Sequence, residues 1–321
     1  MAITQPSDSA LPANVVAPVA DLAKLRFAAR ELTLTPKGPV KSALSGTRSS
    51  RFRGRGMDFD EVRPYQAGDD IRSIDWRVTA RTTVTHTKIF REERERPLLL
   101  VCDLRQSMLF GSQRLKSVVV CEIAALLGWA GLNSGDRVGA LVFGSQQQRD
   151  IRTRHSQHSV LQLIHALHET SINLAQSAAK EKQAERYTLT EILEDTRRVA
   201  HPGANIIVIS DFKDLDSDGE RHLYELGRHC SLSLCHIYDT LERHLPPPGQ
   251  YQVSQGARRF TLNTASKQLR ERFEQQYHQQ EQALRQTATR FKIPLLSFST
   301  DEAVIDKLRQ TFGKRPRRKH L

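Results

Sequence analysis

The chain has 321 residues and a formal net charge of +12, and 38% of its residues are hydrophobic and 6% aromatic. These values are sufficient for one mostly aliphatic α/β core with a substantial extension. The apolar runs are shorter than a membrane span, and MAITQPSDSA lacks a signal-peptide pattern, so we expect a cytoplasmic protein without a membrane span. The positive charge favours association with acidic surfaces of protein, nucleic acid or lipid.

The N-terminal part begins with residues 1–20, which are rich in Ser, Pro and Ala and which we expect to be disordered. Apolar residues at helical spacing then predict a helix over Asp21–Leu32. Two basic runs, Arg48–Arg55 and Lys314–His320, carry much of the excess charge. The second run is broken by proline and has no apolar face, so residues 313–321 are expected to form a disordered basic tail.

A dense stretch from Gly54 to Arg81 alternates Arg and Asp with large apolar side chains. Ile74, Trp76 and Val78 are spaced by two residues, which indicates an extended segment. Such a stretch can fold over the edge of a sheet through Arg–carboxylate pairs, or it can present Arg and Trp to a partner. We favour the structural interpretation, because each Arg has a carboxylate close by in the sequence.

The strongest strand signal is the unbroken apolar run Leu98–Cys102, which ends in Asp103. A run of this kind, followed by a polar turn and a helix, is typical of a parallel strand buried on both faces. Predicted strands and helices then alternate as far as Phe312, with a polar loop expected over Glu169–Arg186. This alternation predicts an α/β fold with a doubly wound, mostly parallel sheet.

A second apolar run, Asn205–Asp211, repeats the pattern of the first and also ends in an aspartate. The carboxyl ends of parallel strands lie along one edge of a sheet, where open α/β sheets bind their ligands. We therefore expect Asp103, Arg105, Ser107 and Asp211 to converge at this edge.

The stretch from Gly54 to Met108 resembles the domain of unknown function family 58, whose members are MoxR-associated proteins. The matching positions follow one order and are far more specific than any short motif. They are Gly56, Phe59, Arg63, Tyr65, Gly68, Asp69, Arg72, Ile74, Asp75, Trp76, Ala80, Arg81, Asp103, Ser107 and Met108. The resemblance implies a von Willebrand factor A-type fold with an N-terminal charge-rich β extension.

On this basis the chain divides into four parts. Residues 1–20 are the disordered N-terminus, and residues 21–96 hold the N-terminal helix and the family-specific extension. Residues 97–312 are the von Willebrand factor A-like domain, and residues 313–321 are the basic tail.

The resemblance also implies a candidate metal site. In von Willebrand A-type domains the first strand ends in Asp-x-Ser-x-Ser, which holds Mg²⁺ together with a threonine and a second aspartate. One coordination position is left for a partner's carboxylate, which suits the octahedral preference of Mg²⁺. Here Asp103 and Ser107 match, Asp211 matches the later aspartate, and Arg105 replaces the first serine.

Arg105 removes an oxygen ligand and adds a positive charge where the metal would lie, and like charges repel strongly outside bulk water. Pointing inward, it could pair with Asp103 or Asp211 and replace the metal; pointing outward, it would leave a weakened site. We favour the metal-free interpretation and expect no cofactor. For the threonine, Thr188 is near the right place, but the helix register puts Tyr187 there.

The same residues form the expected partner-binding site. An arginine can pair with a partner's carboxylate without a metal, so a contact through Arg105, Asp103, Ser107 and Asp211 would resist chelators. The alternative, of nearly equal weight, is that Arg105 only neutralises Asp103 and contacts no partner.

We expect a non-enzymatic protein-interaction module with a degenerate metal-ion-dependent adhesion site. The resemblance implies that it acts with a MoxR-type AAA+ ATPase in the assembly or activation of other proteins, with von Willebrand A-type membrane proteins as further partners. The alternative is a basic nucleic-acid-binding protein, although the basic runs lack interleaved aromatic residues. A hydrolase based on Asp103, Asp211 and Asp214 is least favoured, because no paired His or serine elbow lies near them in sequence.

Overall fold

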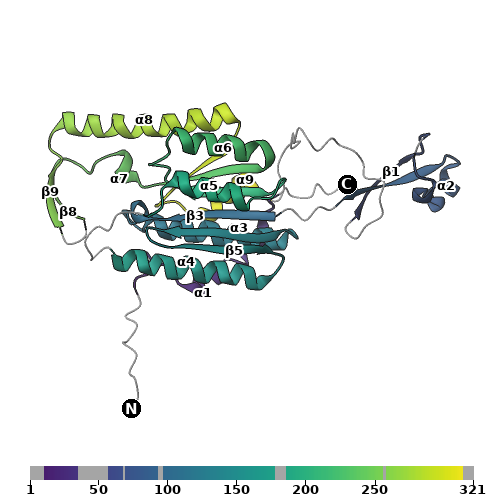
Figure 1. Ribbon diagram of the computed structural model, residues 1–321, viewed down its shortest axis with the longest axis horizontal. Coiled ribbons are helices and arrows are strands. Elements are labelled where there is room, and N and C mark those ends of the chain that lie inside the picture. Colours follow the sequence, from purple (N-terminus) through teal and green to yellow (C-terminus); the bar gives the residue numbers. More distant parts are fainter. Residues whose placement is uncertain are drawn as a thin grey trace, which may run out of the picture. The chain divides into compact units, whose positions relative to one another are not determined.

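The computed structural model describes residues 11–34, 57–67, 69–92, 97–177, 186–255 and 258–313. The chain forms two compact units: residues 1–40 with residues 96–321 make the larger, and residues 41–95 make the smaller (Figure 1). The expected disorder of residues 1–10 and of the basic tail after Gly313, and the basic run Arg48–Arg55, lie outside the described residues.

The larger unit is built on a six-stranded sheet with the strand order β10-β7-β6-β3-β4-β5. Its strands are β3 (Pro97–Leu104), β4 (Arg137–Gly144), β5 (Gln148–Arg154), β6 (Asn205–Ser210), β7 (Ser231–Tyr238) and β10 (Leu295–Ser299). All neighbours are parallel except β5, which runs antiparallel to β4 at one edge. The chain moves outward from β3 to β5 and then continues on the other side of β3, which is the order of a doubly wound fold.

Helices cover both faces of this sheet, because alternate residues of a strand point to opposite faces. In β3, Leu98, Leu100 and Cys102 join one hydrophobic cluster, and Leu99 and Val101 join the other. The first cluster includes residues of α1 (Val19–Lys24), α3 (Lys116–Asn133), α4 (Gln157–Ser177) and α9 (Val304–Phe312). The second includes residues of α5 (Leu189–Val199), α6 (Ser217–His229) and α8 (Lys267–Phe291), and Figure 1 shows these helices across the sheet from α1 and α4.

Shorter elements complete the larger unit. They are the 3₁₀ turns η1 (Ala28–Glu31) and η3 (Gln106–Met108), the short helix α7 (Thr240–Arg243), and a hairpin of β8 (Gln250–Gln255) and β9 (Arg258–Asn263). Among them, η3 and α7 both follow strands at the carboxyl edge of the sheet.

Helix α3 is long and apolar enough to cross a membrane by length and composition alone, which differs from the expectation that the apolar runs are too short. Its 18 residues have a mean hydropathy of 1.3, and 83% of them are buried inside the protein. A helix that is apolar on all sides suits either a membrane or a core. Here α3 lies against the sheet and α4 and supplies much of the first hydrophobic cluster.

The smaller unit is a hairpin of β1 (Met57–Pro64) and β2 (His86–Glu92), with η2 (Ile71–Ser73) and α2 (Trp76–Thr82) between the strands. The predicted N-terminal β extension is confirmed. The extended segment expected around Trp76 is wrong, however, because Asp75 starts a helix there. Its carboxylate accepts hydrogen bonds from the backbone N–H groups of Arg77 and Val78 at 3.0 and 3.2 Å, and this capping overrides the period of two.

Two further local predictions are wrong. Helix α4 continues to Ser177, into the first half of the expected loop, because small polar residues, Thr170 and Ser171, lie on its buried face and hide the helical period. At the N-terminus, residues 11–20 are ordered: Val16 and Ala17 are only 3% and 4% exposed, and α1 belongs to the larger unit rather than to the extension.

Candidate functional site

Asp103 lies at the carboxyl end of β3 with its side chain fully buried. Its carboxylate accepts hydrogen bonds from the Ser210 hydroxyl at 2.7 Å and from Nε and Nη2 of Arg105 at 3.1 and 2.9 Å. The backbone N–H of Arg105 adds a fourth bond at 3.0 Å. Burial raises the pKa of Asp103, and the charge of Arg105 and the Ser210 hydroxyl offset this only in part.

Arg105 connects Asp103 to a second carboxylate, Asp214, on the loop after β6. Its Nη1 and Nη2 donate to the two oxygens of Asp214 at 2.5 and 2.8 Å, which is the forked geometry of a strong Arg–carboxylate pair. Nη1 also donates to the carbonyl oxygen of Tyr187 at 3.3 Å. All five N–H donors of the guanidinium thus have acceptors within the chain, and only 2% of Arg105 is exposed.

Asp214 closes this arrangement toward the solvent. Its side chain is 39% exposed, and it also accepts a hydrogen bond from the backbone N–H of Leu189, the first residue of α5, at 3.0 Å. Partial burial would raise the pKa of Asp214, but the hydrogen bonds and charge of Arg105 outweigh that effect and lower it. Arg105 and Asp214 therefore remain a charged pair at neutral pH.

A second buried cation, Lys116, holds Asp211. Lys116 is the first residue of α3, and its Nζ donates to Oδ2 of Asp211 and to Oε1 of Glu242 at 2.8 Å each. Lys213 donates to the same Glu242 oxygen at 2.5 Å. Burial disfavours the charged forms of Lys116 and Asp211. The two carboxylates nevertheless raise the pKa of Lys116, and Lys116 lowers the pKa of Asp211.

The structure brings some of the predicted site residues together and separates others. Asp103 and Arg105 are in direct contact, while Asp211 lies at the same edge of the sheet and is paired with Lys116 instead of Arg105. Ser107 lies half-buried in η3, and among the described residues no hydrogen bond joins its hydroxyl to either aspartate.

Thr188 and Tyr187, the two residues considered at the threonine position, both have the relevant oxygen atom engaged in other hydrogen bonds. Thr188 is the N-cap of α5, where its hydroxyl accepts from the backbone N–H of Glu191 at 3.2 Å and donates to the carboxylate of Glu191 at 3.0 Å. Tyr187 contributes only its backbone carbonyl, which Arg105 occupies. The expected threonine therefore serves the helix and not the site.

The residues present do not fit Mg²⁺. This ion requires about six oxygen ligands in octahedral geometry, whereas two internal cations, Arg105 and Lys116, already neutralise Asp103 and Asp211. Among the described residues, no group of three or more His, Cys, Asp or Glu side chains is arranged to hold a metal ion.

Sequence reasoning missed three residues that complete the site: Lys116, Ser210 and Glu242. Lys116 had a usable signal, since it is the one basic residue in the mostly apolar segment 116–133. Asp214 was considered only as a hydrolase residue, and its role here is to pair with Arg105.

Comparison with known proteins gives relatives for most of the chain. Two uncharacterized proteins, Rv1480 of Mycobacterium tuberculosis and Mb1516 of Mycobacterium bovis, are each 28% identical to it over 286 residues, which cover 87% of this chain and 86% of theirs. Among solved structures, the conserved hypothetical protein BatB from Bacteroides thetaiotaomicron matches with a TM-score of 0.42 and 15% identity, over 67% of this chain and 96% of that one. A von Willebrand factor type A protein from Catenulispora acidiphila matches with a TM-score of 0.30 and 16% identity, over 48% of this chain and 35% of that one.

The family comparison covers the greater part of the chain. The profile described as "Protein of unknown function DUF58" matches residues 61–283, which span most of both units. The predicted α/β fold with a doubly wound, mostly parallel sheet is confirmed by the strand order described above. The chain belongs to the DUF58 family.

Proposed function

We propose that this protein is a non-enzymatic interaction module whose metal-ion-dependent adhesion site is degenerate, with internal cations in place of the metal. One observation carries this proposal: Asp103 and Asp211, the two aspartates of the candidate site, are neutralised by buried Arg105 and Lys116. A carboxylate that is already paired and hydrogen-bonded has little to gain from a divalent ion, because binding the ion would first require breaking the internal pair.

The saturation of Arg105 supports one of the two roles considered for it. A partner's carboxylate needs free guanidinium donors, and the donors of Arg105 are all used by Asp103, Asp214 and Tyr187. We therefore assign Arg105 to neutralise Asp103 and to hold the loop of Asp214, and we place partner contacts on neighbouring exposed surface.

The partner in this proposal is a MoxR-type AAA+ ATPase, with which the module would help to assemble or activate other proteins in the cytoplasm. The resemblance of Gly54–Met108 supports this partner, and it also supports von Willebrand A-type membrane proteins as further partners. The confirmed fold class suits an interaction role, since the carboxyl edge of such a sheet is a common binding surface.

Affinity recovery of the tagged protein from its native cells tests the proposal. We expect an AAA+ ATPase to be recovered equally with Mg²⁺ and with EDTA, because the contact needs no divalent ion. Before EDTA is added, the ATPase is cross-linked so that it stays in its nucleotide-bound state. Loss of the ATPase on chelation would then contradict the degenerate site. Recovery of nucleic acid instead, abolished by nuclease, would favour the alternative nucleic-acid-binding function.

A further inference from the structure

Helix α2 of the smaller unit presents an exposed face made of Trp76, Arg77, Ala80 and Arg81, here called the Trp76 face. Residues four apart lie one above the other on a helix, so Trp76 adjoins Ala80 and Arg77 adjoins Arg81. The side chain of Trp76 is 67% exposed. A tryptophan and two arginines thus share one solvent-facing surface, which favours the alternative that this stretch presents Arg and Trp to a partner.

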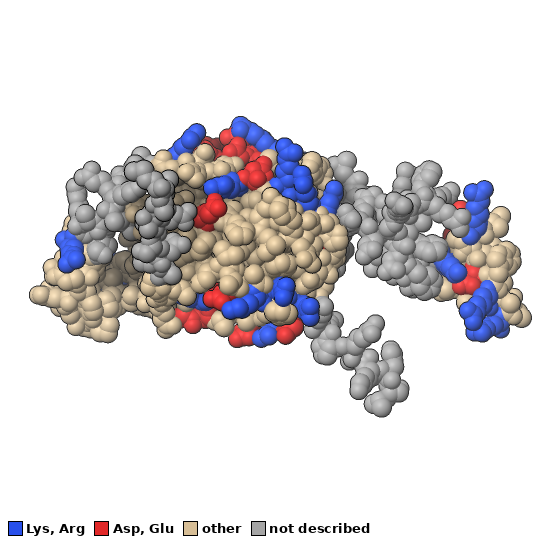
Figure 2. All heavy atoms as spheres, turned by 90° about the horizontal axis from the view of Figure 1, so that it is seen from below, with Lys and Arg blue, Asp and Glu red and all other residues tan. Residues whose placement is uncertain are grey.

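The arginines of this face have no ion-pair partner among the described residues. Carboxylates that are close in sequence are used locally: Asp75 caps α2 and lies 3.5 Å from Lys88, and Asp69 pairs with Arg63 at 2.8 Å. Figure 2 shows Lys and Arg side chains standing on the surface of this unit. The Trp76 face therefore carries positive charge that the described part of the unit does not neutralise.

We propose that the Trp76 face binds an acidic segment of a partner protein, in which two carboxylates about one helical turn apart flank an apolar side chain. Guanidinium groups recognise carboxylates through paired hydrogen bonds in a fixed plane. Tryptophan and arginine are also the residues that contribute most to binding energy when a partner covers them. This surface lies in the smaller unit, uses none of the residues around Asp103, and is independent of the function proposed above.

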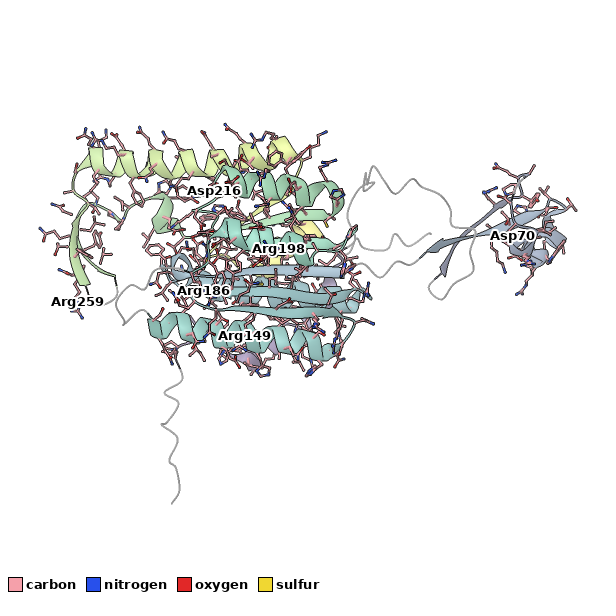
Figure 3. The ribbon with its side chains drawn as sticks, viewed as in Figure 1. Asp70, Arg149, Arg186, Arg198, Asp216 and Arg259 are labelled. Carbon is pink, nitrogen blue, oxygen red and sulfur yellow. The ribbon has the colours of Figure 1, made fainter. Side chains whose placement is uncertain are left out.

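A nucleic acid fits this face less well. Sites for single-stranded nucleic acid combine a positive groove with several aromatic side chains on which bases stack, and the Trp76 face contains a single aromatic residue. Exposed Asp70, on the same unit in Figure 3, and the carboxylate of Asp75 would repel a phosphate backbone. Isolated carboxylates on a partner segment can avoid them, because such a segment is not uniformly charged.

The test uses the full chain and a fluorescently labelled synthetic helical peptide. The peptide carries two Glu residues four positions apart beside one Leu, and a control peptide carries Gln in place of Glu. Fluorescence anisotropy should show saturable binding of the Glu peptide that weakens as salt is raised, and no binding of the Gln peptide. Equal binding of both peptides, or no binding of the Glu peptide, would overturn the proposal.

Variants then locate the contact. Trp76→Ala and the pair Arg77→Glu/Arg81→Glu should each weaken binding at least tenfold, whereas Arg272→Glu, at an exposed arginine of α8, should leave it unchanged. The pair Arg77→Lys/Arg81→Lys keeps the charge and removes the paired guanidinium hydrogen bonds, so its affinity for the Glu peptide should lie between those of the parent and of the Glu pair. It replaces the Glu pair as the test if the Glu pair perturbs the fold of the unit. An equal loss of peptide affinity in Arg272→Glu would contradict a specific contact at this face. Displacement of the peptide by a single-stranded oligonucleotide that depends on Trp76 would contradict a face specific for protein.

Discussion

Arg105 and Lys116 pair with the two aspartates of the candidate site, and each carries its charge inside the protein. Arg105 contacts two carboxylates, and Lys116 contacts two others. Buried ion pairs of this kind add little net stability as a whole, because removing both charges from water is costly. Removal of one partner is different, since it leaves the other charge buried and unpaired.

The first residue-scale prediction concerns Arg105→Met. It should lower the free energy of unfolding by about 3–5 kcal/mol, because Asp103 would be left buried without its cation. The double variant Asp103→Asn/Arg105→Met should lose clearly less than the sum of the single changes, because it removes both charges. Urea denaturation of the three variants measures this, and additive losses would show that the two side chains are not coupled.

The second residue-scale prediction concerns acid sensitivity. The folded pKa of Asp214 lies below its ordinary value of 3.8, so its stabilising contribution is present above that pH and is lost as the pH falls through the folded pKa. Asp214→Asn should therefore show a smaller loss of stability on acidification than the parent. Denaturation curves between neutral pH and pH of about 3 measure the difference. Asp218→Asn, at an exposed position on α6, is the control and should behave like the parent.

At the scale of elements, helix α2 depends on its cap more than on its largest side chain. The carboxylate of Asp75 accepts two hydrogen bonds from the first turn of the helix, and the bond from the Val78 N–H is the main cause of its lowered pKa. Trp76, in contrast, points to solvent. We therefore expect Trp76 to contribute little to the stability of this unit, because a side chain that is two-thirds exposed loses few contacts on truncation.

This assignment gives an element-scale prediction. Asp75→Ala should destabilise the smaller unit by about 1 kcal/mol, and Asp75→Asn should retain most of the stability because Asn also caps helices. Trp76→Ala should change stability by less than about 0.5 kcal/mol, as exposed substitutions usually do. Hydrogen exchange at the backbone amides of α2 reports on this unit directly. A larger effect for Trp76→Ala than for Asp75→Ala would mean that Trp76 is buried in solution.

At the scale of the whole molecule, the chain consists of two compact units. The larger unit carries a sheet with two hydrophobic clusters and the internally neutralised site, and the smaller one carries the exposed Trp76 face. Nothing in the described part of either unit offers a Mg²⁺ site, so the stability of the full chain should not depend on that ion.

Thermal unfolding checks this whole-molecule prediction. A ligand at a hundredfold excess over its Kd stabilises a protein by about 2.7 kcal/mol, which would raise the melting temperature of a chain of this size by several degrees. We expect equal melting temperatures in millimolar Mg²⁺ and in EDTA. A clear rise with Mg²⁺ in the parent, absent in Asp103→Asn, would establish a metal site that uses Asp103.

The sequence by itself determined the central strand, the alternation of strands and helices, and the positions of Asp103 and Asp211 at strand ends. These features depend on local apolar runs and periodicity, which short stretches of chain contain in full. It also showed Arg105 at the position where the resemblance implies a serine. Local patterns failed where a capping carboxylate or small polar residues on a buried face changed the period, as in α2 and in the second half of α4.

Only the tertiary structure decided how the charges are paired. Arg105 contacts Asp214 across 109 positions of sequence, and Lys116 contacts Asp211 across 95 and Glu242 across 126. No local pattern specifies such pairs, because they form only when separate strand ends and helix starts meet at one edge of the sheet. The structure also decided that Trp76 faces solvent, since exposure depends on which neighbouring elements cover a side chain and not on the side chain itself.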